Sequence, residues 1–343
     1  MELGIGMFGD LRFDKTTRQF QSAGQRLQEI IEEVKLADQL EIDLFAMGEH
    51  HRPDYAVSAP EIMLSALSTT TQHIKLVSGV SVISSSDPVK LYQDFSMLDL
   101  ISNQRAEILA GRGSFIESFP LFGYDLNNYV ELFEEKLDLL HQLNENETLT
   151  WEGKHRAALK NQTIYPRPER KIPIWIAVGG TPSSVERAAK YGFPIIFAII
   201  GGTPDQFLPL INYYKEQYIA SGHDPAQIRI GVHSHAYIGN SDEEVVKKYF
   251  SNYAEQMNRI GKDRGWGPYT LQQFRGGMSP QGSLFMGNWE AVAEKIIRTI
   301  ELFGLTRFIA HIDNGAPHHK EIMKTIELYG EKVIPMVRKH FKK

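Results

Sequence analysis

The stretch Ile172–Ile200, IPIWIAVGGTPSSVERAAKYGFPIIFAII, decides the fold because it has the pattern of one strand–helix–strand unit. Its first apolar run, Ile172–Val178, is followed by a helix signal in which Thr181 is the expected N-cap, Pro182 the first helical residue and Gly192 the stop. A second apolar run closes the unit. Short apolar runs that alternate with amphipathic segments are typical of repeated βα units.

The same unit recurs along the whole chain. Strands with a helical pattern after each are expected near Leu3–Phe8, Leu44–His50, Lys75–Ile83, Arg105–Ala110, Ile172–Val178, Pro194–Ile200, Ile228–Ile238 and Thr306–Ile312. Eight units predict an α/β fold, a closed (β/α)8 TIM barrel, for which about 250 residues is usual and insertions are common. An open doubly wound sheet is the alternative. That sheet usually carries a GxGxxG turn after its first strand, whereas Gly4 and Gly6 lie inside the predicted strand.

The 343 residues predict a single domain, 1–343, with two insertions in the barrel. Residues 148–168 have the pattern of a hairpin with a turn at Glu152–Gly153 and a second strand at Thr163–Tyr165. Residues 261–287 are rich in glycine, contain scattered aromatic side chains and show no period. Long irregular segments in compact domains are usually functional or disordered, so we expect a mobile lid over the site here.

Composition narrows the class of function. The net charge of −5 excludes a nucleic acid or an anionic membrane as the main partner, since both require a basic face. The absence of cysteine excludes disulfides, thiolate metal ligands and a cysteine nucleophile. No apolar run reaches the length of a membrane span and no signal peptide is recognisable, so we expect a cytoplasmic protein that acts on a small molecule.

In such a barrel the chemistry takes place at the carboxyl ends of the strands. The second strand ends in Glu49 and His50, which are our candidate catalytic residues. The third ends at Gly79 and Val80, where the glycine lets a ligand come close to the backbone. The fourth ends with Arg112 between two glycines, an arrangement that offers a guanidinium to a phosphate with little steric obstruction.

The end of the fifth strand has the pattern of an anion site. A helix capped at Thr181 presents free backbone N–H groups and the positive end of its dipole to the opening. The candidate ligand-binding residues here are Gly179, Gly180, Thr181, Ser183 and Ser184. The alternative is an ordinary turn before a capped helix. Arg112 is a cationic donor at the end of the neighbouring fourth strand. A phosphate-bearing cofactor therefore accounts both for Arg112 and for the helix start.

The histidines leave a second reading open. We expect His50 to be functional, and His51 to point away from it because adjacent strand residues face opposite sides. The pair His233 and His235 projects from one face of a strand, a spacing that a barrel metal site uses. A metal-dependent hydrolase is therefore an alternative, although no comparable cluster recurs on neighbouring strand ends and we predict no metal ligands.

Several segments resemble, in the same order, the core signature of the luciferase-like flavin monooxygenases. The matching segments are Glu49–His51, Asp87–Asp99, Ser102–Glu107, Gly111–Gly113, Leu121–Asp125 and Val178–Ser184. The resemblance implies a TIM-like barrel and FMN held by its phosphate at Arg112 and the end of the fifth strand. It also implies a non-prolyl cis peptide near Gly79–Val80 and a functional His50. Gly111 stands where the luciferase α subunit has a reactive cysteine, so light emission is not implied.

The resemblance also indicates the reaction and the partners. We expect reduced FMN and O2 to act on a small organic substrate, with reduced FMN supplied by a separate NAD(P)H-dependent flavin reductase because the chain shows no second nucleotide-binding module. Related enzymes use a deazaflavin coenzyme for hydride transfer, which is an alternative, as is a flavin-binding barrel without turnover. Apolar residues spread over two sides of the helices predicted at 60–67 and 89–101, which predicts a homodimer.

Overall fold

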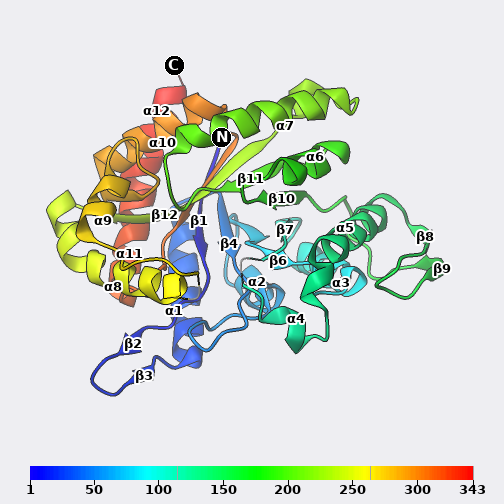
Figure 1. Ribbon diagram of the computed structural model, residues 1–343, viewed down its shortest axis with the longest axis horizontal. Helices are drawn as coiled ribbons and strands as arrows, with labels where there is room; N and C mark the ends of the chain where they lie inside the picture. Colours follow the sequence, from blue (N-terminus) through cyan, green and yellow to red (C-terminus); the bar gives the residue numbers. More distant parts are fainter. Residues whose placement is uncertain (114, 263, 343) are drawn as a thin grey trace.

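The computed structural model describes residues 1–113, 115–262 and 264–342 and shows a closed parallel barrel with helices outside it (Figure 1). Each strand pairs with the next, and the last pairs with the first. In order around the barrel the strands are β1 (Glu2–Met7), β4 (Leu44–Met47), β5 (Lys75–Ser78), β7 (Ala106–Gly111), β10 (Ile174–Val178), β11 (Ile195–Ala198), β12 (Ile230–Gly239) and β14 (Arg307–His311). The predicted (β/α)8 barrel is confirmed.

The outer layer consists of helices that follow the strands in sequence. Its long helices are α1 (Ala23–Gln39), α2 (Pro60–Ser68), α3 (Pro88–Ile101), α5 (Tyr129–Glu145), α6 (Pro182–Lys190), α7 (Leu208–Ala220), α8 (Asp242–Lys262), α10 (Trp289–Phe303), α11 (His319–Leu328) and α12 (Ile334–Phe341). Further helical segments are α4 (Ser118–Leu121), α9 (Leu271–Met278), η1 (Leu126–Asn128), η2 (Pro204–Phe207), η3 (Pro225–Gln227) and η4 (Tyr329–Val333). Within the described ranges no helix combines the length and apolarity that a membrane crossing requires.

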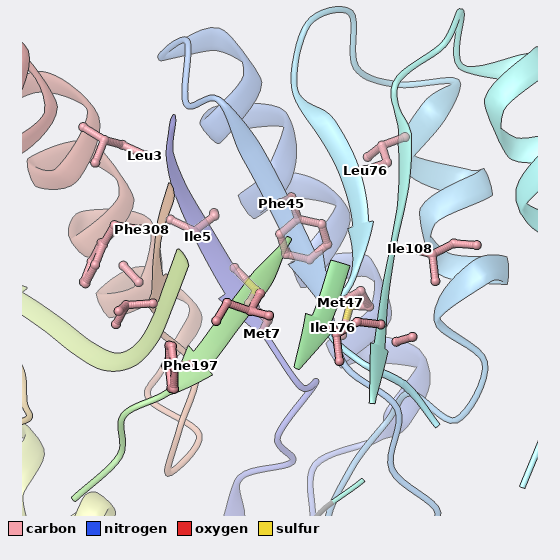
Figure 2. Close-up of a cluster of buried hydrophobic side chains, with 14 of the residues drawn as sticks. Leu3, Ile5, Met7, Phe45, Met47, Leu76, Ile108, Ile176, Phe197 and Phe308 are labelled. Carbon is pink, nitrogen blue, oxygen red and sulfur yellow. The ribbon is translucent and has the colours of Figure 1, made fainter. Parts of the chain in front are cut away.

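Side chains alternate along each strand between two apolar layers. Leu3, Ile5 and Met7 of β1 lie in the layer between barrel and helices, which also holds Phe45, Leu76, Ile108 and Ile176 of neighbouring strands (Figure 2). A smaller cluster from the strands consists of Leu44, Ala46, Val77, Leu109, Trp175, Ile196 and Ile309. Burying each large side chain contributes about 1.5–3 kcal/mol, so the pattern of alternate apolar positions fixes which face of each strand points outward.

The amino ends of the strands are closed by buried ion pairs. The guanidinium of Arg307 lies 2.8 Å from a carboxylate oxygen of Glu107 and 2.6 Å from one of Glu2. It also lies over the ring of Trp175, at 4.1 Å from the centroid. Lys75 adds a contact of 3.1 Å to Glu107. Every charge in this group therefore has a partner.

The strand predicted at Lys75–Ile83 is divided into two. β5 ends at Ser78, and the short strand β6 (Ser81–Val82) pairs with β7. The peptide bond between Gly79 and Val80 is cis, as the resemblance implies. A Cβ on Gly79 would lie 2.9 Å from the Cβ of Ala46, so only glycine lets the chain pass this close to β4.

The predicted hairpin in residues 148–168 is present as β8 (Thr148–Trp151) and β9 (Leu159–Thr163), but its second strand begins earlier than predicted. The connection between the two strands covers residues 152–158, beyond the predicted turn at Glu152–Gly153. Within it, the carboxylate of Glu135 on α5 accepts the N–H groups of Lys154 and His155, at 2.6 and 2.9 Å. This contact holds the chain against α5 before the second strand begins.

The prediction that residues 261–287 lack regular structure is wrong for α9 and for the strand at the end of the segment. α9 begins with a capping box in which Thr270 and Gln273 bond reciprocally to each other's backbone N–H groups. The strand β13 (Phe285–Asn288) pairs with β12, which runs beyond the barrel and offers a free edge. Phe274 and Phe285 are buried. A local cap and a tertiary edge create this order, neither of which shows as a period in the sequence.

A small hairpin, β2 (Phe13–Asp14) with β3 (Gln19–Phe20), was not predicted. It follows β1 and projects from the molecule at the end opposite the N-terminus (Figure 1). Since β1 runs from the N-terminus toward this end, the carboxyl ends of the strands face the same way.

Candidate active site

A cavity of about 210 Å³ lies at the carboxyl ends of the barrel strands. Six predicted site residues line it: Glu49, His50, Gly79, Val80, Arg112 and Gly179. Phe8, Tyr129 and His233 line it as well, although we did not predict them as residues of this site. The strand ends that the sequence singled out therefore meet around one space.

His50 is a buried, neutral imidazole at the end of β4. Its ring packs against Phe8, Tyr55 and Phe115, with centroids 4.6, 4.3 and 5.1 Å away. Burial, with a smaller contribution from His311, lowers the pKa of His50 to about 3. Its Nε2 has no hydrogen-bond partner in the described part of the chain. A buried nitrogen without a partner is costly, so this atom is suited to bind a ligand in the cavity.

Glu49 connects two strand ends. One carboxylate oxygen lies 2.9 Å from Nε2 of His51, and the other accepts the N–H of Val82 at 2.8 Å. Both oxygens thus have protein partners, and Glu49 holds β6 against the end of β4. His51 does not line this cavity, but it borders a smaller one together with His50, so the expectation that the two cannot share a pocket holds only for the main cavity.

Arg112 is a cation for which the described residues supply no anionic partner. Its guanidinium lies over the ring of Tyr129, at 4.8 Å from the centroid. Within residues 1–113, 115–262 and 264–342, no carboxylate lies within ion-pair distance of it. Gly111 is required here because a Cβ would lie 2.9 Å from the side chain of Val80. Arg112 is therefore available to a bound anion.

The turn after β10 brings a helix N-terminus beside Arg112. Because Ile176 of β10 pairs with Ala110 of β7, the residues that follow these strands are neighbours. Gly180 has a φ of +121°, a conformation that favours glycine. Thr181 is the N-cap of α6, as predicted, but its side chain makes no cap hydrogen bond. Pro182 has no N–H and the N–H of Ser184 donates to the carbonyl of Thr181 at 3.1 Å, so among the first three residues of α6 it is the N–H of Ser183 that has no backbone acceptor in the described residues and is open to an anion.

The predicted residues of this turn do not all play the same part. Gly179 lines the cavity, whereas Gly180, Thr181 and Ser183 are exposed next to it. Ser184 is buried, and its hydroxyl donates to the carbonyl of Thr181 at 2.6 Å. The structure therefore places Ser184 within the helix start and away from the cavity.

The histidine pair on β12 has two separate sets of contacts. Nε2 of His233 lies 3.1 Å from Nδ1 of His311, at the end of β14. Nδ1 of His235 lies 3.0 Å from the hydroxyl of Tyr253 on α8. In the described ranges no three histidine, aspartate or glutamate side chains are arranged to hold a metal ion. The sequence pattern singled out His233, but as a possible metal ligand. It did not indicate His311.

Comparison with known proteins agrees with this geometry. The family model of the luciferase-like monooxygenases matches residues 1–307. An uncharacterised protein of Sinorhizobium fredii is 22% identical over 93% of this chain and 94% of its own length. N-acetyl-S-alkylcysteine monooxygenase of Bacillus subtilis is 29% identical over 52% of each chain. The oxygenase component of the flavin-dependent trigonelline monooxygenase of Acinetobacter baylyi is 25% identical over 65% of this chain and 62% of its own.

Solved structures share the whole fold. A monooxygenase of Streptomyces bottropensis superposes with a TM-score of 0.85 at 23% identity, covering 98% of this chain and 99% of the other. The oxygenating constituent of 3,6-diketocamphane monooxygenase of Pseudomonas putida, in complex with FMN, gives 0.77 at 19% identity, covering 98% of both chains. An F420-dependent secondary alcohol dehydrogenase gives 0.73 at 17%, covering 98% and 100%. With its barrel, its cavity and a family match over most of its length, this chain belongs to the luciferase-like monooxygenase family.

Proposed function

We propose that this protein is an FMN-dependent monooxygenase that uses reduced FMN and O2 to oxidise a small organic substrate. The observation that carries the proposal is Arg112, a cation without a carboxylate partner in the described residues, beside the open N-terminus of α6. A phosphate satisfies both groups. The FMN complex of the diketocamphane monooxygenase supports the choice of cofactor, since it shares the fold.

The residues present fit a flavin. Gly179 has open space where a side chain would stand, which leaves room for a bulky ligand next to the phosphate donors. The cavity wall beyond it is largely apolar, with Val80, Leu109 and Ile196, and suits a flat aromatic ring. Nε2 of His50, at the end of β4, has no partner in the described residues. It adds one hydrogen-bonding group across the cavity from the end of β10.

When bound, the flavin supplies the redox chemistry, and the protein binds, orients and shields the reactants. Arg112 and the start of α6 hold the phosphate. Phe8 and Val80 exclude water from the cavity. His50, neutral at physiological pH, donates or accepts a hydrogen bond through Nε2 and moves a proton there. Glu49 positions the β6 backbone and contributes no free carboxylate oxygen.

A separate NAD(P)H-dependent flavin reductase is the proposed source of reduced FMN. The trigonelline enzyme supports this arrangement, since its similar chain is the oxygenase component of a flavin-dependent monooxygenase. All eight βα units of this chain belong to one barrel, which leaves no second nucleotide-binding fold in the described residues. The proposal places the protein in the cytoplasm, where NAD(P)H is available.

Hydride transfer with the deazaflavin coenzyme is the alternative function. It is favoured by the shared fold of the F420-dependent secondary alcohol dehydrogenase, whose structure contains an F420–acetone adduct. Fluorescence titration with FMN, reduced FMN and the deazaflavin coenzyme separates the two cofactors. We expect the tightest binding for reduced FMN. A preference for the deazaflavin coenzyme overturns the FMN assignment.

Oxygen consumption tests the reaction itself. Reduced FMN, O2 and a panel of small organic substrates are supplied to the purified protein, and products are analysed after reaction in ¹⁸O2. Incorporation of one labelled oxygen atom into a product is the expected result. Product formation without label contradicts oxygenation, and oxidation of flavin without any product supports a binding protein without turnover.

We propose a homodimer through α2 and α3. Ile62 on α2 and Met97, Leu100 and Ile101 on α3 are large apolar side chains that stand 42–70% exposed in the single chain. The two helices pack against each other and form one surface. Light scattering at micromolar concentration is expected to give twice the chain mass. Ile101→Asp is expected to produce the monomer, whereas Ile219→Asp on α7, at a comparably exposed position, is the control.

Closure of the predicted lid, residues 261–287, over the site stays a prediction, and residues 264–270 form a stretch of it without a helix or strand. Trp266 is half exposed, and this stretch lines a separate cavity of about 800 Å³ beside the end of β11. Limited proteolysis with and without reduced FMN tests it. Protection of this stretch only in the presence of flavin is the expected result, and equal cleavage in both states contradicts a lid.

A further inference from the structure

A chain of three side chains leads from the cavity into the protein interior. His233 on β12 lines the cavity, and its Nε2 lies 3.1 Å from Nδ1 of His311 on β14. Nε2 of His311 in turn lies 3.2 Å from a carboxylate oxygen of Asp313. A Cβ on Gly6 would lie 2.7 Å from Nε2 of His233, so glycine on β1 leaves the space that this chain occupies.

Asp313 is a fixed anion at the inner end of the chain. Its carboxylate accepts the backbone N–H groups of Phe8, Gly9 and Asp10, at 3.0, 2.8 and 3.2 Å, and lies 3.4 Å from the guanidinium of Arg26. Burial alone would raise the pKa of Asp313. The contact with His311, the charge of Arg26 and the backbone donors outweigh burial and hold it well below its ordinary value.

This anion favours one placement of the protons on both imidazoles. Nε2 of His311 lies at ion-pair distance from the carboxylate but has no hydrogen-bond partner among the described residues, so it is the negative charge that favours a proton on that nitrogen. When His311 carries this single proton, its Nδ1 is an acceptor and Nε2 of His233 is the donor to it. In a neutral imidazole one nitrogen carries hydrogen, so Nδ1 of His233 is left as a lone-pair acceptor. No hydrogen bond occupies that nitrogen within the described residues.

We propose that His233 is a second acid–base residue of the cavity, with Nδ1 held as a proton acceptor by the positioning residues His311 and Asp313. This role deepens the proposed function, on which its part in turnover rests. The substrate class is one with an ionisable O–H or N–H group. The arrangement follows the logic of a histidine oriented by a buried carboxylate, with a second imidazole inserted between the two.

The proton transfer is balanced in two linked steps. The substrate O–H or N–H bond breaks, its electron pair stays on the substrate, and the proton bonds to Nδ1 of His233. The proton on Nε2 of His233 moves to Nδ1 of His311, which becomes an imidazolium, and the ionised carboxylate of Asp313 stabilises that positive charge without taking the proton. Reversal of the same steps returns a proton to the product.

The surroundings of His233 keep it uncharged until a ligand arrives. Burial lowers the pKa of His233 well below its ordinary value, and His311 and His235 lower it further, whereas Asp313 acts in the opposite direction. The ring of Phe8 lies 6.2 Å from that of His233 and 4.1 Å from that of His311, and covers the pair from β1. In the absence of a ligand, His233 is therefore neutral, the protonation state that a proton acceptor requires.

The tautomer of His233 tests the proposal without flavin or substrate. Protein labelled with ¹⁵N-histidine is studied by long-range ¹H–¹⁵N correlation, and the His233 signals are identified as those missing from His233→Gln. The expected wild-type spectrum shows a protonated Nε2 and an unprotonated Nδ1. In Asp313→Asn the amide donates to His311, which reverses both imidazoles and puts the proton of His233 on Nδ1. A wild-type His233 with its proton on Nδ1 overturns the proposal.

A second variant keeps the test decisive if Asp313→Asn does not fold, since that carboxylate also holds three backbone groups. His311→Phe preserves the ring contact with Phe8 and removes the acceptor, so the signal of the hydrogen-bonded proton on Nε2 of His233 is expected to disappear. His235→Phe is the matched control, because it lies on the same strand and bonds to Tyr253 instead. An unchanged His233 spectrum in His311→Phe overturns the proposal.

Turnover provides a separate measurement. With reduced FMN and O2, His311→Phe is expected to lower kcat at least tenfold and to leave the affinity for reduced FMN within twofold of wild type. Full kcat in His233→Gln overturns the acid–base role. If the wild-type protein does not oxidise any substrate, the proposed function fails, and the tautomer spectra still decide whether His233 is an oriented acceptor.

Discussion

The two ends of the barrel treat charge in opposite ways. At the amino ends of the strands, Arg307 is buried between Glu107 and Glu2, and each charge has a partner within 3 Å. At the carboxyl ends, Arg112 lies over an aromatic ring with no carboxylate beside it in the described residues, and Nε2 of His50 is buried without a hydrogen bond. We call the amino end saturated, because each of its charges has an ion-pair partner. We call the carboxyl end unsaturated, because a cation and a buried nitrogen have no such partner among the described residues.

This difference separates structure from function within one fold. A buried charge that loses its partner is strongly destabilising, so selection for folding pairs the groups that only stabilise the barrel. Groups left without protein partners reduce stability unless something else binds them. The unsaturated end is thus where a ligand contributes free energy that the chain itself does not supply. The comparison predicts that variants at the amino end change stability and variants at the carboxyl end change binding or turnover.

The largest effect is expected at the saturated end. Arg307→Met leaves the buried Glu107 with only Lys75 as a partner and should reduce the free energy of unfolding by about 3–5 kcal/mol. Urea unfolding followed by circular dichroism measures this change. Arg338→Met is the control, since its pair with Asp43 is partly exposed and exposed pairs contribute about 0–1 kcal/mol. Equal losses in the two variants contradict the special role of the buried group.

At the unsaturated end, the largest effect is expected on turnover. His50→Ala removes the imidazole that faces the cavity and should lower kcat by about 10²–10⁴-fold, the usual contribution of an acid–base group. Flavin affinity should stay within twofold of wild type, because the phosphate donors are on other strands. His51→Ala is the control, since His51 bonds to Glu49 outside the cavity. Full activity in His50→Ala rules out the catalytic role.

The phosphate donor is the next test of the unsaturated end. Arg112→Ala loses a charge-assisted contact of about 1.5–3 kcal/mol, which corresponds to roughly a 10- to 150-fold weaker affinity for FMN. Its stability should change by less than about 0.5 kcal/mol, because its guanidinium forms no ion pair in the described chain. Arg229→Ala is the control, since that side chain bonds to carbonyls at the start of β12. Unchanged FMN affinity in Arg112→Ala removes this residue from the site.

The sequence predicted the barrel because each strand carries its own local signal. A run such as Ile172–Val178, with Thr181 and Pro182 after it, contains both the strand and the start of the following helix. Each strand end can therefore be predicted from its own local sequence, and the closed barrel then brings the ends together. This is why His50, Arg112 and Gly179 were found and do line one cavity.

Contacts between distant residues were beyond such reasoning. Asp313 accepts the N–H of Gly9, more than 300 positions away, and no local pattern indicates that pair. β13 forms because β12 has a free edge, which is also a tertiary property. Serine is a common phosphate donor, which is why Ser184 was predicted to bind one. Its hydroxyl instead donates to the carbonyl of Thr181 one helical turn back. Sequence indicated the types of residue at the site, whereas the three-dimensional fold determined their partners.

The smallest effect concerns pH. Burial, together with His311, lowers the pKa of His235 to about 3, whereas in the unfolded chain its pKa is near 6.5. Between these two values the unfolded chain binds a proton that the folded chain does not, so this residue makes the protein less stable as the pH falls. His235→Phe removes that term. Between pH 5.5 and 4, wild type should therefore lose about 1.4 kcal/mol per pH unit more than the variant.

Urea unfolding of wild type and variant at several pH values in this range measures the two slopes. His340→Phe is the control, because that side chain is exposed on α12. At the saturated end, burial would raise the pKa of Glu2, but Arg307 and Lys75 outweigh it and lower that pKa, so this end also loses stability as the pH falls, equally in wild type and in His235→Phe. If His235→Phe and wild type lose stability in parallel, His235 takes up its proton in the folded protein. In that case the carboxyl end would stabilise a protonated His235 more than its contacts indicate, and the contrast between the two ends would be weaker.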